Sequence, residues 1–423
     1  MDLAPKIRLV VIGLVISRWV AEVGLEWLNR RSVLAHAANV PEVFRGVVDE
    51  PTYARSVDYS LTKTNFRWVE LTFNTALLLV ILFSGVLPWA FETVERSLGQ
   101  SAWVMAGFLF MTGVGLSLVG LPLDWYAQFH IEERFGFNTS TQKTWWLDRV
   151  KGLLLGIVIG YPLLILLLSC VKWTGPWWWF WAWSALLVFQ LLMTVLAPVL
   201  ILPLFNKFTP LSEGSLRERL MKLAGRTQFR AKSIQVMDGS KRSRHSNAFF
   251  TGVGAFRKIV LFDTLLQHLS EPELEAVLAH EIGHYKKRHI PKMLVASAVA
   301  SLLGFYCLAF LTRQKWFFEA FGFELGNSAP AFLLFGLMAG LVTFWFSPLA
   351  HVWSRRYEYQ ADNFAAEVMG EPSSLINALR KLNEKNLSNL TPHPLYSGFY
   401  YSHPTLLERE AGLKVIAPAG SGV

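Results

Sequence analysis

Two histidines stand four residues apart in the segment His280-Glu281-Ile282-Gly283-His284. On a helix this spacing puts both imidazoles on one face, where they can hold a single metal ion. Glu281 lies between them and can take a proton from water that the ion activates, then pass it to a leaving amine. The pattern therefore predicts metal-assisted hydrolysis of a peptide bond, with Glu281 as the general base. The alternative is a chance match on a solvated helix face.

A catalytic zinc ion takes three ligands from the protein and keeps a further position for water. Glu358 and Asp362, one helical turn apart, are the candidates far downstream. Glu358 can be the third ligand, while Asp362 orients one of the metal-binding histidines. Taken alone, a Glu/Asp pair after two arginines is more typical of a surface ion-pair face. The predicted topology, given below, favours the ligand interpretation.

The composition is that of a membrane protein. Hydrophobic residues make up 52% of the 423 residues, and there are 17 tryptophans; the mean hydropathy is +0.34. The net charge of +9 comes from basic residues between hydrophobic runs, without a nucleic-acid-binding motif, so no nucleic-acid partner is expected. Cys170 and Cys307 both lie in hydrophobic runs, which argues against a cysteine metal site or a disulfide framework.

A membrane-spanning helix needs about twenty apolar residues. Seven segments meet or approach this length, and they predict seven spans centred on residues 9–28, 69–91, 103–126, 153–171, 180–202, 293–312 and 331–353.

Basic residues are distributed unevenly over the loops between these spans. One set of loops is rich in them: Arg30, Arg31, Arg45, Arg55, Lys63, Arg67, Arg134, Lys143, Arg149, Lys151, Arg355 and Arg356. The other set offers little beyond Lys6, Arg8, Arg96, Lys172, Arg313 and Lys315. Short loops rich in arginine and lysine stay in the cytoplasm, so the first set is predicted to be cytoplasmic. Both metal-binding segments then lie on the cytoplasmic side.

The one long polar stretch, residues 206–291, is predicted to form the main soluble part. A helix is expected at 217–223, short strands at 233–236, 247–251 and 258–262, and a second helix at 271–287 that begins with an N-cap at Ser270. The predicted division is 1–205 for the first five spans, 206–291 for the protease domain, 292–353 for the last two spans, and 354–423 for a segment that completes the active site.

Charged residues also occur inside the spans. Arg18, Glu22 and Glu26 follow one another along one face of the first span, and Glu70 with Asn74 repeats the spacing in the second. Such side chains normally face a cavity or one another. A polar chamber is predicted; helix-packing ion pairs without a chamber are the alternative.

The two metal-binding motifs together resemble those of the type I CAAX prenyl protease family. Further resemblance lies in Phe-His-Ile-Glu-Glu-Arg-Phe-Gly-Phe-Asn at 129–138, Pro-Leu-Phe-Asn-Lys-Phe-Thr-Pro-Leu at 203–211, Ser-Asn-Ala-Phe-Phe at 246–250 and Ser-His-Pro at 402–404. The resemblance implies a mainly α fold, with seven transmembrane helices forming a barrel around a water-filled chamber and a small α+β zinc-protease domain closing it. It also implies one Zn²⁺ per chain.

Further roles come from the same resemblance. Asn247 and His403 would hold the substrate backbone or stabilise the oxyanion. The strand with Asn247, Ala248 and Phe249 would border the substrate groove and pair with an extended peptide. Arg409 is a weaker candidate, as an ion-pair partner near the metal.

The expected substrates are CAAX-type prenylated or other membrane-associated peptides. The membrane would be the endoplasmic reticulum in a eukaryote and the plasma or inner membrane in a bacterium, and the oligomeric state stays open. A quality-control metalloprotease of membrane proteins is an alternative function. A seven-span transporter or receptor is the alternative that is not an enzyme.

Overall fold

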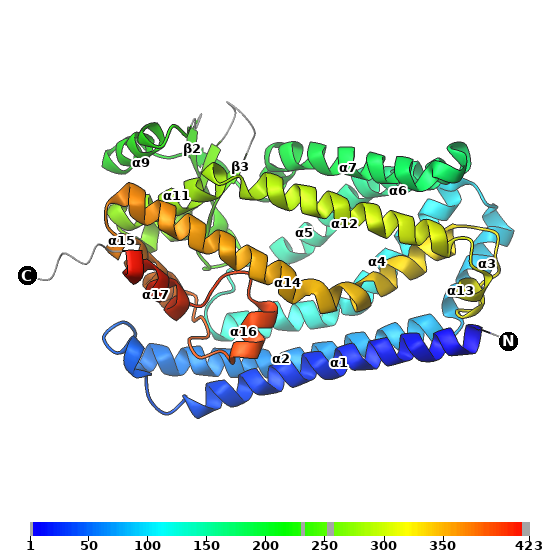
Figure 1. Ribbon diagram of the computed structural model, residues 1–423, viewed down its shortest axis with the longest axis horizontal. Helices are drawn as coiled ribbons and strands as arrows, with labels where there is room; N and C mark the ends of the chain where they lie inside the picture. The colour runs from blue at the N-terminus through cyan, green and yellow to red at the C-terminus, as the bar shows by residue number, and fades with distance from the viewer. Residues whose placement is uncertain (1–2, 230–232, 252–257, 417–423) are drawn as a thin grey trace, which may run out of the picture.

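The computed structural model describes residues 3–229, 233–251 and 258–416. Long helices run side by side along most of the molecule, and a small sheet with several shorter helices gathers at one end (Figure 1). The helices are α1 (Ala4–Ala35), α2 (Glu50–Phe83), α3 (Val86–Leu98), α4 (Ala102–Tyr126), α5 (Gln142–Leu155), α6 (Tyr161–Trp173), α7 (Trp178–Leu196), α8 (Leu202–Phe205), α9 (Ser215–Arg226), α10 (Asp263–His268), α11 (Glu271–Lys286), α12 (His289–Leu311), α13 (Lys315–Glu319), α14 (Ala329–Met369), α15 (Ser373–Lys385), α16 (Pro394–Tyr400) and α17 (Leu406–Ile416). The strands are β1 (Phe208–Pro210), β2 (Ser233–Met237), β3 (Ala248–Thr251) and β4 (Lys258–Phe262).

Among the described residues, six helical segments are long and apolar enough to cross a membrane. They are Glu50–Phe83, Ala102–Glu132, Gln142–Trp173, Gly175–Phe205, His289–Leu311 and Ala329–Met369. The remaining predicted span falls in α1, which has 32 residues and packs along α2 (Figure 1). Its apolar run is interrupted by charged residues, of which Glu22 and Glu26 are buried together with Asn29. The predicted class, a mainly α multi-span membrane protein with a small α+β part, is confirmed.

Several boundaries differ from the sequence prediction. The second span was expected to end near residue 91, but α2 ends at Phe83 and α3 starts at Val86, after Gly85 in the left-handed conformation (φ 82°). The predicted domain boundary at 353/354 falls inside α14, which continues unbroken to Met369. The boundary at 291/292 falls inside α12. In both places the helix outlasts its apolar run, because backbone hydrogen bonding does not stop where the side chains become polar.

The sheet, which lies with the shorter helices at one end of the molecule (Figure 1), has the order β1-β2-β4-β3. β2 and β4 are parallel, whereas β1 and β3 pair antiparallel with their neighbours, so β3 is an edge strand. The three predicted strands and both predicted helices are present. Ser270 and Glu273 form a capping box at the start of α11, which fixes where that helix begins.

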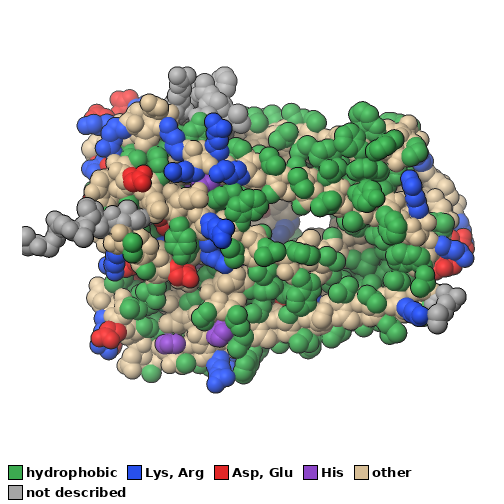
Figure 2. Space-filling view, in the orientation of Figure 1, with side chains coloured by type: hydrophobic (Ala, Val, Ile, Leu, Met, Phe, Trp, Pro, Cys, Tyr) green, Lys and Arg blue, Asp and Glu red, His purple; other side chains and the backbone are tan. Residues whose placement is uncertain are grey.

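The described residues form two large hydrophobic cores. One joins α9, α11 and α15 at the end that carries the sheet, and the other joins α3, α6, α13 and the first half of α14 towards the opposite end. Figure 2 shows a broad apolar face over the long helices, charged residues at both ends, and a deep hollow in the middle of that face. An apolar band bounded by charge is the surface that a bilayer requires.

Candidate metal centre

The site is built where α11 crosses α14. The two helices pack closely against one another, with Gly283 of α11 at their contact. His280 and His284 project from α11, and Glu358 projects from α14. The structure therefore brings together the two motifs that lie about 75 residues apart in the sequence, as the predicted topology favours.

The three side chains converge closely. One ligand atom from each of His280, His284 and Glu358 lies within 4.8 Å of the others. Nε2 of His280 is 3.4 Å from Oε2 of Glu358, and Nε2 of His284 is 3.3 Å from Oε1. Two imidazoles and a carboxylate in this arrangement match a catalytic zinc site.

Two observations indicate that the site fits a cation. Oε2 of Glu358 is buried, and among the described residues it has no well-aligned hydrogen-bond donor, although imidazole nitrogens approach it. Burial opposes a charge on His280, but the neighbouring carboxylates of Asp362 and Glu358 outweigh it and raise its pKa to about 9. The surroundings therefore favour positive charge between these side chains.

Asp362 and Arg409 lie behind His280. Oδ1 of Asp362 is 2.7 Å from Nδ1 of His280, and Asp362 is only 1% exposed. The guanidinium of Arg409 donates to both carboxylate oxygens of Asp362, and from Nε the distance is 2.9 Å. This arrangement fixes the ring of His280 so that Nε2 points towards Glu358.

Glu281 and His403 are two further residues close to the three ligands. Burial raises the pKa of Glu281, which strengthens it as a proton acceptor. Nδ1 of His403 is 2.8 Å from Oε2 of Glu358, and its side chain is 64% exposed. The structure therefore brings His403 to the metal site from a segment outside both motifs.

Asn247 lies just before the edge strand β3. Its backbone oxygen accepts from the N–H of Phe262 on β4 at 3.1 Å. Its side-chain oxygen accepts from the N–H of Ala248 at 2.8 Å. Because successive residues of a strand point their N–H groups to opposite sides, the N–H of Ala248 belongs to the free edge and that of Phe249 to the β4 side.

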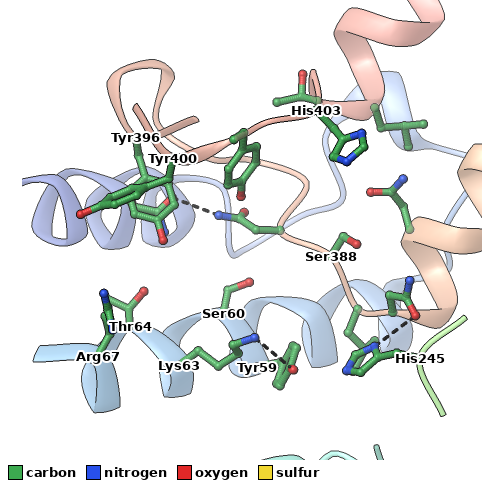
Figure 3. A pocket seen from close by; sticks show the side chains of 18 of the residues that line it. Tyr59, Ser60, Lys63, Thr64, Arg67, His245, Ser388, Tyr396, Tyr400 and His403 are labelled. Carbon is green, nitrogen blue, oxygen red and sulfur yellow. Dashed lines mark hydrogen bonds between the residues drawn. The ribbon is translucent and has the colours of Figure 1, made fainter. Parts of the chain in front are cut away.

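A cavity of about 790 Å³ adjoins the metal site. Its lining includes His403 and Arg409 as well as Tyr59, Lys63 and Arg67 of α2. Figure 3 shows α2 as one wall, with His403 reaching into the space from the opposite wall, which also carries Tyr396 and Tyr400 of α16. The predicted polar chamber thus has a counterpart beside the metal site.

Two residues near the site have no role in the sequence analysis. One is His289, whose Nδ1 is 3.0 Å from Nδ1 of His284. The other is Gln360 of α14, two residues after Glu358. Its side-chain oxygen is 2.9 Å from Nε2 of His289. The sequence does show a third histidine, His289, five residues after His284. That spacing does not put two side chains on the same face of one helix, so it gave no reason to connect the two residues.

Comparisons with known proteins agree with this geometry. Residues 29–207 match the family model described as CAAX prenyl protease N-terminal, five membrane helices, and residues 210–417 match Peptidase family M48. A CAAX prenyl protease 1 homolog of Arabidopsis thaliana is 35% identical, with 94% of this chain and 95% of that protein covered. CAAX prenyl protease 1 of Saccharomyces cerevisiae is 36% identical, with 97% and 96% covered.

A solved structure resembles the whole chain. The crystal structure of S. mikatae Ste24p superposes with a TM-score of 0.88 at 34% identity, covering 96% of this chain and 98% of that one. These matches favour a peptidase over a transporter or receptor. The chain therefore belongs to the CAAX prenyl protease 1 family, whose members are integral-membrane metalloendopeptidases of the M48 type.

Proposed function

We propose that the protein binds one zinc ion per chain through His280, His284 and Glu358, and that it hydrolyses peptide bonds beside that ion. The observation that carries the proposal is the convergence of ligand atoms from α11 and α14 within 4.8 Å. A zinc ion bound there would lower the pKa of water and polarise the scissile carbonyl.

The side chains around this site supply the remaining chemistry. Glu281 takes a proton from the attacking water and returns it to the nitrogen of the leaving amine. His403 projects into the cavity and donates a hydrogen bond to the oxygen that becomes negative as the carbonyl is attacked. Asp362 and Arg409 hold His280 in place. The edge of β3, with Asn247, Ala248 and Phe249, binds the substrate backbone as an added strand.

The proposed substrates are peptides that carry a prenyl group at a CAAX-type C-terminus. Similar proteins are named CAAX prenyl protease 1, and that name supports the substrate class here. The cavity beside the metal site and the hollow in the apolar face (Figure 2) are consistent with a substrate that has both a peptide and a lipid part. Clearance of other membrane-associated peptides is the alternative that the experiment below separates.

We further propose that the active site faces the cytoplasm. In the predicted topology, loops rich in arginine and lysine lie on the same side of the membrane as the metal-binding segments, which supports a cytoplasmic active site.

In the proposed division of the chain, 206–291 and 354–423 act together as the catalytic part, because α14 carries Glu358 as a continuation of the last span. The side of the membrane on which the active site lies can be tested with a cysteine at the exposed position Glu367. Its labelling is measured in sealed vesicles of known orientation.

The function is tested with detergent-purified protein and a fluorogenic peptide, prenylated or not. Wild type should contain about one zinc per chain and cleave the prenylated peptide faster. Glu281→Ala should keep zinc and lose about 10²–10⁴-fold in cleavage, whereas Glu358→Ala should lose zinc. Glu367→Ala, an exposed glutamate on the same helix, is the matched control.

Two results would count against the proposal. The metal assignment fails if wild type holds no zinc, or if Glu358→Ala holds as much as wild type. The CAAX assignment fails separately if both peptides are cleaved at the same rate.

A further inference from the structure

His289 is a buried histidine to which the mechanism gives no role. It is the first residue of α12 and is only 1% exposed. Its ring stacks on Tyr357 of α14, with centroids 4.0 Å apart and planes 9° apart. Tyr357 directly precedes the ligand Glu358, so His289 is wedged between the two helices that hold the metal site.

A strained turn puts His289 there. Arg288, between α11 and α12, has φ 56° and ψ 41°, the left-handed conformation that residues other than glycine rarely adopt. This conformation is strained for an L-residue. It turns the chain between the two helices, so that His289 at the start of α12 comes within hydrogen-bond distance of His284 in the last turn of α11. Such strain persists where surrounding contacts fix it, often at functional sites.

The hydrogen bonds of His289 form a chain from α14 to the metal site. Nε2 of His289 is 2.9 Å from the side-chain oxygen of Gln360, and Nδ1 of His289 is 3.0 Å from Nδ1 of His284. An amide oxygen only accepts, so Nε2 of His289 is the donor. In a neutral imidazole the other nitrogen is then an acceptor, so Nδ1 of His284 donates to it. Nε2 of His284 is left with its lone pair directed at the metal site.

The opposite direction would defeat metal binding. If Gln360 turned its NH₂ group to His289, the protons would shift along the chain and Nε2 of His284 would carry a hydrogen. That nitrogen could then not bind a metal ion. The oxygen of Gln360 therefore selects the tautomer in which His284 is a ligand, just as Asp362 does for His280.

We propose that His289 and Gln360 are positioning residues that hold His284 in its metal-binding tautomer and orientation. The inference rests on the proposed function, in which His284 is a zinc ligand. His289 serves as a neutral acceptor, whereas Asp362 is a charged one, so the two histidine ligands are oriented without a second carboxylate behind them.

The test compares two replacements of His289 in the full-length, zinc-loaded protein. His289→Phe keeps an aromatic ring to stack on Tyr357 but has no acceptor. His289→Asn loses the ring, but its amide oxygen is the same number of bonds from Cα as Nδ1 of histidine, so it keeps an acceptor for His284.

Zinc release to a chelator is measured, together with the visible spectrum of the cobalt-substituted protein. His289→Phe should bind zinc about 10–100-fold more weakly and change the cobalt spectrum, and His289→Asn should recover most of the affinity.

Three further variants complete the design. Gln360→Met removes the acceptor at an exposed side chain, so it tests the chain of bonds even if His289→Phe fails to fold; it should also weaken zinc binding. Ile290→Ala, at the exposed neighbour of His289, is the control. His284→Ala reports on the zinc site itself.

If His284→Ala loses zinc while His289→Phe or Gln360→Met retains wild-type affinity, the positioning role is wrong and the zinc site stands. Equal losses in His289→Phe and His289→Asn would likewise overturn it, since packing would then be the cause. Retention of zinc by His284→Ala would overturn the proposed function instead.

Discussion

Gly283 lies directly against the backbone of Ala361. A Cβ atom at position 283 would be 2.9 Å from the Cα atom of Ala361 and 3.1 Å from its carbonyl oxygen. Glycine is thus required between the two histidines of α11, because a side chain there would push α14 away. The ligand Glu358 lies one turn before Ala361, so the distance between the helices also sets the size of the metal site.

Gly283→Ala should therefore damage both stability and metal binding. The contacting atoms belong to backbone and cannot move aside, so overpacking should cost about 1–3 kcal/mol and displace Glu358 from the histidines. Thermal unfolding and zinc content measure the two effects. Gly225→Ala is the control, because nothing lies within 4 Å of a Cβ at that helical position; it should be neutral or stabilising by up to about 1 kcal/mol. Wild-type zinc affinity in Gly283→Ala would contradict this account.

The residues at the centre of the site were predictable because their spacing in the sequence places them on one helix face. His280 and His284 are four residues apart and therefore share a face of α11, and Glu358 and Asp362 share a face of α14 for the same reason. Neither pattern needs knowledge of the fold. That the two pairs meet followed only from topology and from resemblance, since about 75 residues separate them.

The residues that were missed depend on tertiary structure. His289 reaches His284 only because Arg288 adopts a left-handed conformation, and Gln360 reaches His289 only because α14 continues past its apolar run. Hydropathy marks where a segment stops being apolar, not where its helix ends. The same limit explains the second span, where Gly85 starts a new helix inside an apolar stretch.

Removing the guanidinium of Arg409 should destabilise the protein through Asp362. Asp362 is buried, and Arg409 donates two hydrogen bonds to it. Arg409→Leu leaves this carboxylate without its cation, which should cost about 3–5 kcal/mol. Denaturant unfolding measures the loss. In the double variant with Asp362→Asn, the lone buried charge is gone, so that variant should unfold with a smaller loss than Arg409→Leu. A double variant as unstable as the sum of both single changes would show that the pair is not coupled.

Replacing His403 should affect the chemical step and spare the fold. Its side chain is mostly exposed, and it contacts the site through Glu358. His403→Ala should keep its melting temperature and its zinc, while kcat falls by about 10²–10³-fold through loss of a donor to the oxyanion. Steady-state kinetics on the fluorogenic peptide separate kcat from KM. A rise in KM with unchanged kcat would assign His403 to substrate binding and remove it from transition-state stabilisation.

The edge of β3 offers a matched pair of proline substitutions. The N–H of Ala248 points to the free edge, and that of Phe249 points to β4, because Asn247 already bonds to Phe262 on the β4 side. Ala248→Pro should therefore leave the sheet intact. It removes the N–H that donates to the side chain of Asn247 and that would turn to a bound peptide, a hydrogen bond worth about 0.5–1.5 kcal/mol. We expect kcat/KM to fall about 3–10-fold at an unchanged melting temperature. Phe249→Pro removes a hydrogen bond within the sheet and should lower the melting temperature instead. If Ala248→Pro cleaves the peptide as fast as wild type, the substrate does not pair with this edge through Ala248, and the binding strand must be sought elsewhere along the cavity.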